Sequence, residues 1–194
     1  MSKLYNAISG VILAGGRSNR MGFPKSNLLV KGKRIIDITL EVLQTFFDEI
    51  FIVTDDRKQI GQIKGANVVE DLVKGCGPMA GIYTGLKVIS NDKAFFVACD
   101  MPFLHPGLIS RLLDSAKDGS LDCVIPHSDK GIEPLHAVYA KSILAGLEDA
   151  LSRGELSIRQ LLHRYNCKYI KSRKEELSSF FNINTPEDLK EICR

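Results

Sequence analysis

Residues 7–25 read AISGVILAGGRSNRMGFPK, and the layout of this segment sets the architecture expected for the whole chain. Its first part, Ala7–Leu13, is mostly apolar, which is typical of a strand buried on both faces of a parallel sheet. Gly15 and Gly16 then allow a tight turn that presents backbone N–H groups to an anion. In open α/β folds, a loop that follows a buried strand in this way lies at the ligand-binding edge of the sheet.

The same loop carries positive charge without any acid. Arg17, Arg20 and Lys25 supply three cations that suit phosphate oxygens. Residues 1–36 contain seven basic residues and no acidic one, whereas the remainder contains 19 basic and 23 acidic residues. A local excess of this kind indicates an anion site rather than a nucleic-acid surface, which is basic over a whole face. The loop is not a Walker A motif, because Gly10 and Gly15 are followed by Gly16 and Arg17 rather than by lysine and a serine or threonine.

Along the rest of the chain, short apolar runs alternate with amphipathic stretches, which predicts β-α-β units and a parallel sheet. The predicted strands are Ala7–Leu13, Ile50–Thr54, Val68–Val69, Ala94–Ala98, Cys123–Pro126, Leu135–Tyr139 and Lys168–Ile170. The predicted helices are Arg34–Phe47, Pro78–Val88, Pro106–Ala116, Lys141–Leu151 and Pro186–Ile192. Because no repeat or linker interrupts this alternation, we expect residues 1–194 to form one domain.

Composition excludes several classes of protein. Apolar residues make up 44% and charged residues 25%, as in ordinary globular proteins. The five cysteines form no C-x-x-C pair or zinc spacing, so we interpret them as reduced thiols. No apolar run approaches the roughly 18 residues needed to span a bilayer, and the start lacks a signal-peptide layout. We therefore expect a cytoplasmic protein without a membrane or nucleic-acid partner.

A candidate metal ligand follows the most apolar of the predicted strands. Residues 94–103 read AFFVACDMPF, so Asp100 comes at the carboxyl end of that strand, just before a proline-directed turn. Carboxylate oxygen is the ligand that Mg²⁺ prefers when it also holds substrate phosphates. The alternative is an aspartate that only caps the loop before Pro106. We favour the metal site.

Two further motifs have competing interpretations. Residues 75–80 read GCGPMA and match a loose dinucleotide-binding pattern, but they follow a minimal strand and include a proline. We interpret them as a turn that opens a helix. Residues 181–188 read FNINTPED; the Asn182 and Asn184 pair could assist a metal or polar substrate, or form a turn before a helix capped by Thr185.

The four histidines show neither a metal-binding spacing nor a Ser/His/Asp arrangement. The lack of a catalytic histidine pattern fits transfer of a nucleotidyl group to an acceptor that is already a phosphate anion. Such an acceptor needs no general base to activate it. Catalysis then depends on alignment and charge neutralisation.

Together, these motifs resemble the molybdenum cofactor guanylyltransferase family of the MobA type, within the GT-A-like nucleotidyltransferase group. The resemblance covers nearly the whole chain. It rests on residues 13–18 (LAGGRS), 20–22 (RMG), Lys25, residues 77–81 (GPMAG), 99–103 (CDMPF), 133–139 (EPLHAVY) and 182–188 (NINTPED).

The resemblance implies a three-layer α/β/α sandwich with a mostly parallel Rossmann-like sheet, of the nucleotide-diphospho-sugar transferase type. It implies an enzyme that uses GTP and Mg²⁺ to attach GMP to molybdopterin, releasing pyrophosphate. Other proteins of molybdenum cofactor biosynthesis and apo-molybdoenzymes are further implied partners. The implied roles are backbone contacts to the nucleotide from Leu13, Ala14 and Gly15, phosphate binding by Lys25, guanosine binding by Asp71, and binding of Mg²⁺ and the nucleotide by Asp100. We expect Lys25, Asp100 and, from the charge of the first loop, Arg17 to be the catalytic residues.

One departure and three alternatives stay open. Thr54-Asp55 stands where the family often has an asparagine that contacts the nucleotide, which leaves the choice between GTP and CTP open. The same chemistry could therefore serve a molybdopterin cytidylyltransferase or a sugar-phosphate nucleotidyltransferase. A non-catalytic GTP-sensing module is the alternative of a different class.

Overall fold

The computed structural model describes residues 5, 7–15, 28–30, 32–185 and 188. The strands are β1 (Ile8–Leu13), β2 (Leu29–Val30), β3 (Lys33–Arg34), β4 (Ile50–Thr54), β5 (Asn67–Glu70), β6 (Lys93–Ala98), β7 (Cys123–Ser128), β8 (Gly131–Ile132), β9 (His136–Ala140) and β10 (Cys167–Lys171). The helices are α1 (Ile35–Leu43), α2 (Arg57–Ile60), α3 (Gly77–Val88), α4 (Pro106–Ala116), α5 (Leu144–Ser152) and α6 (Ile158–Leu162), with 3-10 turns η2 (Lys141–Ile143) and η3 (Lys174–Phe180).

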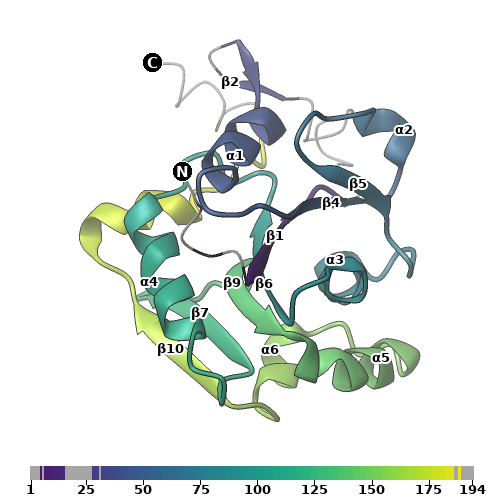
Figure 1. Cartoon of the computed structure of the whole chain (residues 1–194), viewed down its shortest axis with the longest axis vertical. Helices are drawn as coiled ribbons and strands as arrows, with labels where there is room; N and C mark the ends of the chain where they lie inside the picture. The colour runs from purple at the N-terminus through teal and green to yellow at the C-terminus, as the bar shows by residue number, and fades with distance from the viewer. Residues whose placement is uncertain (1–4, 6, 16–27, 31, 186–187, 189–194) are drawn as a thin grey trace.

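The described residues form an eight-stranded sheet in the order β10-β7-β9-β6-β1-β4-β5, with β8 paired to β7. Strands β4 and β6 run parallel to β1, β5 runs parallel to β4, and β10 runs parallel to β7. Strand β9 is antiparallel to both of its neighbours. Helices α1 and α4 cover one face, while α3, α5 and α6 cover the other (Figure 1). The predicted sandwich with a mostly parallel sheet is confirmed.

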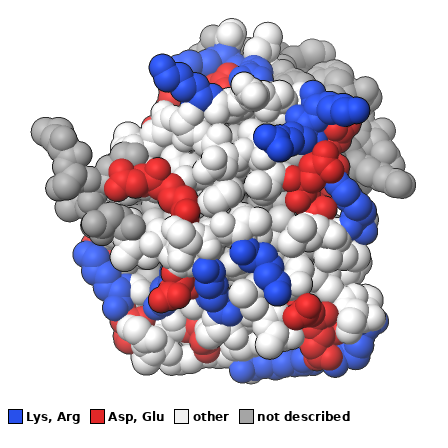
Figure 2. Space-filling model, turned by 45° about the vertical axis from the view of Figure 1, so that its right-hand side comes forward, with Lys and Arg blue, Asp and Glu red and all other residues white. Residues whose placement is uncertain are grey.

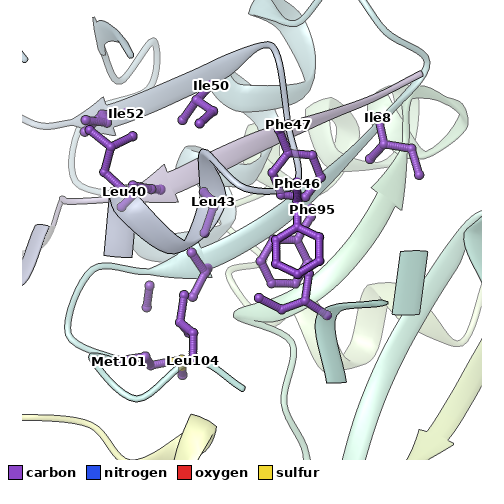
Figure 3. Packing of buried hydrophobic residues seen from close by; sticks show 14 of the residues in the cluster. Ile8, Leu40, Leu43, Phe46, Phe47, Ile50, Ile52, Phe95, Met101 and Leu104 are labelled. Carbon is purple, nitrogen blue, oxygen red and sulfur yellow. The ribbon is translucent and has the colours of Figure 1, made fainter. Parts of the chain in front are cut away.

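The sheet is central because its strands are apolar on both faces. Phe95 points to the face of the sheet that α1 covers, where its ring stacks on Phe47, in the segment after α1, with a centroid distance of 5.9 Å (Figure 3). Phe96, the next residue along β6, points to the opposite face and contacts Tyr139 edge-on at 5.7 Å. Full burial of a side chain of this size contributes about 1.5–3 kcal/mol relative to exposure. Alternate residues of one strand therefore stabilise both helical layers.

Helix α3 packs close to the sheet because glycines line its inner side. A Cβ atom at Gly85 would lie 2.5 Å from the Phe96 ring, and one at Gly81 would lie 2.9 Å from Leu13. The turn before the helix also requires glycine, since Gly75 and Gly77 have positive φ angles of 76° and 63°. The interpretation of residues 75–80 as a helix-opening turn is confirmed, and it fixes where the helix starts.

The structure differs from several sequence expectations at element ends. The predicted helix 34–47 ends at Leu43 and continues as turns, and the predicted helix 141–151 begins as η2. The cap at Thr185 is confirmed, since its hydroxyl accepts a hydrogen bond from the Asp188 amide at 3.2 Å. The rest of the helix predicted for 186–192 lies outside the described residues.

Short elements held by tertiary contacts did not stand out in the sequence, namely α2, α6, β2, β3, β8 and η3. No helix in the described part of the chain is long and apolar enough to cross a bilayer.

Candidate active site

The carboxyl ends of four parallel strands meet at one edge of the sheet. The Ala14 amide donates to the Val53 carbonyl at 2.8 Å, and the Cys99 amide donates to the Leu13 carbonyl at 3.0 Å. These bonds hold the chain after β1 beside the ends of β4 and β6. The residues predicted to meet a nucleotide through backbone groups, Leu13 to Gly15, therefore lie next to the turn that contains Asp100.

Asp71 follows β5 at the same edge, where its amide donates to the Thr54 carbonyl at 2.8 Å. Its side chain is buried, and one carboxylate oxygen accepts hydrogen bonds from the Thr84 hydroxyl at 2.6 Å and the Val73 amide at 3.4 Å. Burial raises the pKa of Asp71 above its ordinary value, and these two donors oppose that rise. Helix α3 thus holds the carboxylate in one orientation.

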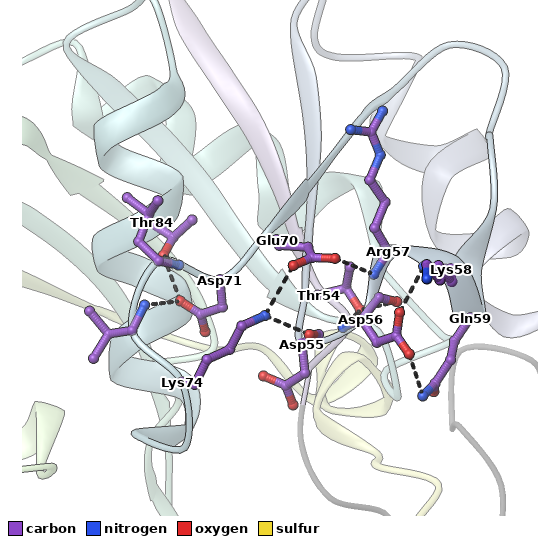
Figure 4. A network of polar contacts seen from close by, with 12 residues as sticks. Thr54, Asp55, Asp56, Arg57, Lys58, Gln59, Glu70, Asp71, Lys74 and Thr84 are labelled. Atoms are coloured by element: carbon purple, nitrogen blue, oxygen red, sulfur yellow. Dashed lines mark hydrogen bonds and ion pairs between the residues drawn. The ribbon is translucent and has the colours of Figure 1, made fainter.

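A network of charged side chains surrounds the ends of β4 and β5 (Figure 4). The Lys74 ammonium donates to the Asp55 carbonyl at 2.6 Å and forms an ion pair with Glu70 at 3.4 Å. A Cβ atom at Gly15 would lie 3.3 Å from an Asp55 carboxylate oxygen. Asp55 therefore lies directly beside the backbone of the first loop, and a side chain at position 15 would have to compete with it for space.

Asp100 lies in the turn after β6 and is partly exposed. Its carbonyl accepts a hydrogen bond from the Ile183 amide at 2.9 Å, which ties the Asn182–Asn184 segment to the site. No cluster of three or more His, Cys, Asp or Glu side chains able to hold a metal occurs in the described ranges. A single carboxylate fits Mg²⁺, because this ion commonly takes one or two protein carboxylates and completes its shell with phosphates and water.

A cavity of about 280 Å³ lies on the other side of Asp100 from Asp71. Its apolar lining includes Met79 at the start of α3 and Met101 directly after Asp100. Its polar lining consists of Glu133, Arg159 and Asn182. The edge of the sheet thus offers a buried carboxylate on one side and a mostly apolar cavity on the other, as two substrates would require.

Charge on the surface is mixed. On the face drawn in Figure 2, the described Lys and Arg side chains are interspersed with Asp and Glu. This distribution differs from the continuous basic face that contacts a nucleic-acid backbone.

Of the residues predicted for the site, Leu13, Ala14, Gly15, Asp71 and Asp100 are brought together at one edge. Lys25 and Arg17 lie outside the described residues. Sequence reasoning missed Thr84, whose partner is 13 positions away, and it gave no role to Arg159. Glu133 belongs to the motif at residues 133–139, but only the fold places it in a cavity beside Asp100.

Comparison with known proteins identifies the family of this chain. The family profile described as a MobA-like NTP transferase domain matches residues 10–169. The chain belongs to this family. It is 38% identical over 192 residues to a protein of Natranaerobius thermophilus named probable molybdenum cofactor guanylyltransferase, covering 95% of this chain and 94% of that protein. It is 32% identical over 191 residues to the molybdenum cofactor guanylyltransferase of Syntrophotalea carbinolica, covering 96% and 90%.

Solved structures extend the comparison. Molybdopterin-guanine dinucleotide biosynthesis protein A from Archaeoglobus fulgidus superposes with a TM-score of 0.83 at 34% identity, covering 95% of this chain and 96% of that one. A 2-C-methyl-D-erythritol 4-phosphate cytidylyltransferase from Thermus thermophilus shares the fold at 18% identity, with a TM-score of 0.72. The predicted membership of the MobA-type family is confirmed. As a member of this family, the chain is a nucleotidyltransferase.

Proposed function

We propose that this chain transfers GMP from GTP to the phosphate of molybdopterin, with release of pyrophosphate and in dependence on Mg²⁺. The observation that carries the proposal is the convergence of Leu13–Gly15, Asp71 and Asp100 on one sheet edge, beside the mostly apolar cavity. The names of the relatives at 32–38% identity favour the guanylyl group and the molybdenum cofactor.

The first step is recognition of the nucleotide. Guanine presents adjacent N1–H and N2–H₂ donors, and a carboxylate such as Asp71 is an acceptor suited to both. The backbone of Leu13, Ala14 and Gly15 provides close approach for the nucleoside, since Gly15 adds no side chain. We assign phosphate binding to Lys25 and Arg17 on the charge pattern of the first loop.

The second step is transfer. Asp100 would hold Mg²⁺, which when bound supplies charge neutralisation for the phosphate oxygens and the leaving pyrophosphate. The acceptor phosphate of molybdopterin is already anionic, so the chain needs to align it rather than remove a proton from it. The cavity beside Asp100 would place that acceptor next to the α-phosphorus of GTP.

The test is incubation of the purified chain with GTP, Mg²⁺ and molybdopterin, followed by mass analysis of the pterin. Guanylylated pterin and stoichiometric pyrophosphate are expected. Parallel reactions with CTP, ATP and UTP separate a guanylyltransferase from a cytidylyltransferase, and a sugar-phosphate acceptor tests the other alternative. Tight GTP binding without product or pyrophosphate in any acceptor reaction would instead indicate the GTP-sensing module.

A further inference from the structure

The cavity beside Asp100 has the lining of a site for a flat ring. Its apolar lining comes from four separate segments: Pro78 and Met79 at the start of α3, Met101 after β6, Pro134 and Leu135 before β9, and Leu156 with Ile158 at the start of α6. Leu156 is 48% exposed, so part of its apolar side chain is accessible to a ligand in the cavity. Methionine and leucine side chains adapt well to the face of a heteroaromatic ring.

Glu133 is the unusual polar group of this cavity. It is half-buried, yet among the described residues its carboxylate accepts no hydrogen bond and forms no ion pair. Burial raises its pKa, while the charges of Arg159 and Lys130 oppose the rise. Because Glu133 is half-buried and has no protein donor in the described part of the chain, its oxygens can accept from water or from a ligand that displaces this water.

Arg159 supplies a donor on the same wall. Its guanidinium donates to the Ile132 carbonyl at 2.7 Å, which fixes the side chain beside the residue that precedes Glu133. The five N–H groups of a guanidinium leave further donors after this bond. The cavity therefore offers an acceptor pair and a donor along one wall, between apolar surfaces.

We infer that Glu133 binds the 2-amino-4-oxopyrimidine edge of the pterin in the acceptor substrate. This edge presents an amino group, a ring N–H and a carbonyl oxygen in that order. The carboxylate of Glu133 accepts from the two N–H groups, and the guanidinium of Arg159 donates to the carbonyl oxygen. The inference rests on the proposed function and adds to it the group that selects the acceptor.

Guanine presents the same order of donors and acceptor, so the position of each carboxylate has to distinguish the two rings. In the strand order β9-β6-β1-β4-β5, Asp100 lies in the turn directly after β6. Glu133 precedes β9 on one side of it, and Asp71 follows β5 on the other side. Two substrates with similar rings would thus meet at Asp100 from opposite directions, each selected by its own carboxylate.

Direct binding tests the inference without turnover. The fluorescence of 6-hydroxymethylpterin is titrated with the full chain, with its Glu133→Gln variant, and with Glu175→Gln, the same change at an exposed position of η3. Each titration is repeated with saturating GTP. We expect Glu133→Gln to bind the pterin at least tenfold more weakly than the parent, Glu175→Gln to match the parent, and GTP not to displace the probe.

Kinetics with molybdopterin provide the second readout. In Glu133→Gln the KM for molybdopterin should rise at least tenfold while the KM for GTP stays within twofold, and Asp71→Asn should show the reverse. Equal pterin binding by parent and Glu133→Gln, or displacement of the pterin by GTP, would overturn the inference. Pterin binding that depends on Glu133 in a chain that makes no guanylylated product would overturn the proposed function instead.

Discussion

At the scale of single residues, the Thr84 hydroxyl links the site to the core. It is completely buried, donates to the Asp71 carboxylate at 2.6 Å and accepts from the Leu72 amide at 3.0 Å. Thr84→Val keeps the shape and removes both bonds, so Asp71 would lose its fixed orientation. Loss of one partner of a buried polar group costs about 1–3 kcal/mol, which corresponds to roughly a 5- to 150-fold rise in the KM for GTP.

Three readouts distinguish this positioning role from general destabilisation. The kcat should change less than the KM, and Thr84→Ser should restore most of the binding. Because the hydroxyl favours the ionised form of Asp71, its loss should raise the pKa of that carboxyl further and move the acidic limb of the kcat/KM profile to higher pH. A KM for GTP within twofold of the parent would remove Thr84 from nucleotide binding.

The carboxylate of Asp100 is a second single group on which activity should depend. Asp100→Asn keeps the side-chain shape and the carbonyl that accepts from Ile183, so the fold should survive. Guanylyl transfer should fall by about 10²–10³, as for other groups that stabilise charge in the transition state. Raised Mg²⁺ should restore part of the activity by mass action. Normal turnover with an unchanged Mg²⁺ dependence would show that another residue holds the metal.

At the scale of elements, the close approach of α3 to the sheet is what places Asp71, Thr84 and the start of the helix at the same edge. Gly85→Ala would bring a Cβ atom within 2.5 Å of the Phe96 ring. Overpacking of this kind costs typically 1–3 kcal/mol, whereas alanine alone would favour a helix by about 1 kcal/mol. We expect the packing effect to dominate and the free energy of unfolding to fall.

Gly119→Ala is the matched control, because a Cβ atom there would meet nothing within 4 Å. Urea unfolding of both variants measures the difference, and Gly119→Ala should stay close to the parent. A Gly85→Ala variant that is more stable than the parent would show that the helix can move away from Phe96 at little cost.

At the scale of the whole molecule, one buried histidine makes the fold sensitive to acid. His136 is completely buried in β9, edge-on to Phe95 and Phe180, and within the described part neither ring nitrogen has a hydrogen-bond partner. Burial lowers its pKa to about 3, against a partial opposing effect of Glu176, which is paired with Arg111.

The pH dependence follows from the direction of this shift. Between pH 6.5 and about 3 the unfolded chain binds one proton more at this position than the folded chain, so stability falls as pH falls. The slope is about 1.4 kcal/mol per pH unit, or roughly 2 kcal/mol between pH 6.5 and pH 5. His136→Met, apolar and similar in volume, should remove this part of the dependence.

Urea unfolding at pH 7.5, 6 and 5 measures the effect, with His163→Gln as the control for an exposed histidine. Between pH 7.5 and pH 5, the free energy of unfolding of His136→Met should fall by about 2 kcal/mol less than that of the parent. The free energy of the His163→Gln control should fall as much as that of the parent. Parallel curves for all three proteins would mean that His136 is not the group responsible.

The sequence by itself determined the fold class and most of the strands. An apolar strand followed by two glycines and three cations indicates a phosphate-binding α/β edge, because each of those properties is local and follows from residue type. The position of Asp100 after an apolar strand is equally local. Strand direction is not a local property. The sequence of β9 is another apolar run, and only its pairing with β6 shows that it is antiparallel.

Only the tertiary structure decided how the site is completed. Asp71 follows β5 and Thr84 lies on α3, and they meet because α3 packs through Gly81 and Gly85. Glu133 lies 33 positions from Asp100 along the chain and faces a cavity beside it only because β9 inserts between β6 and β7. Such contacts depend on strand order and helix packing, which arise from burial summed over the whole chain rather than from any one motif.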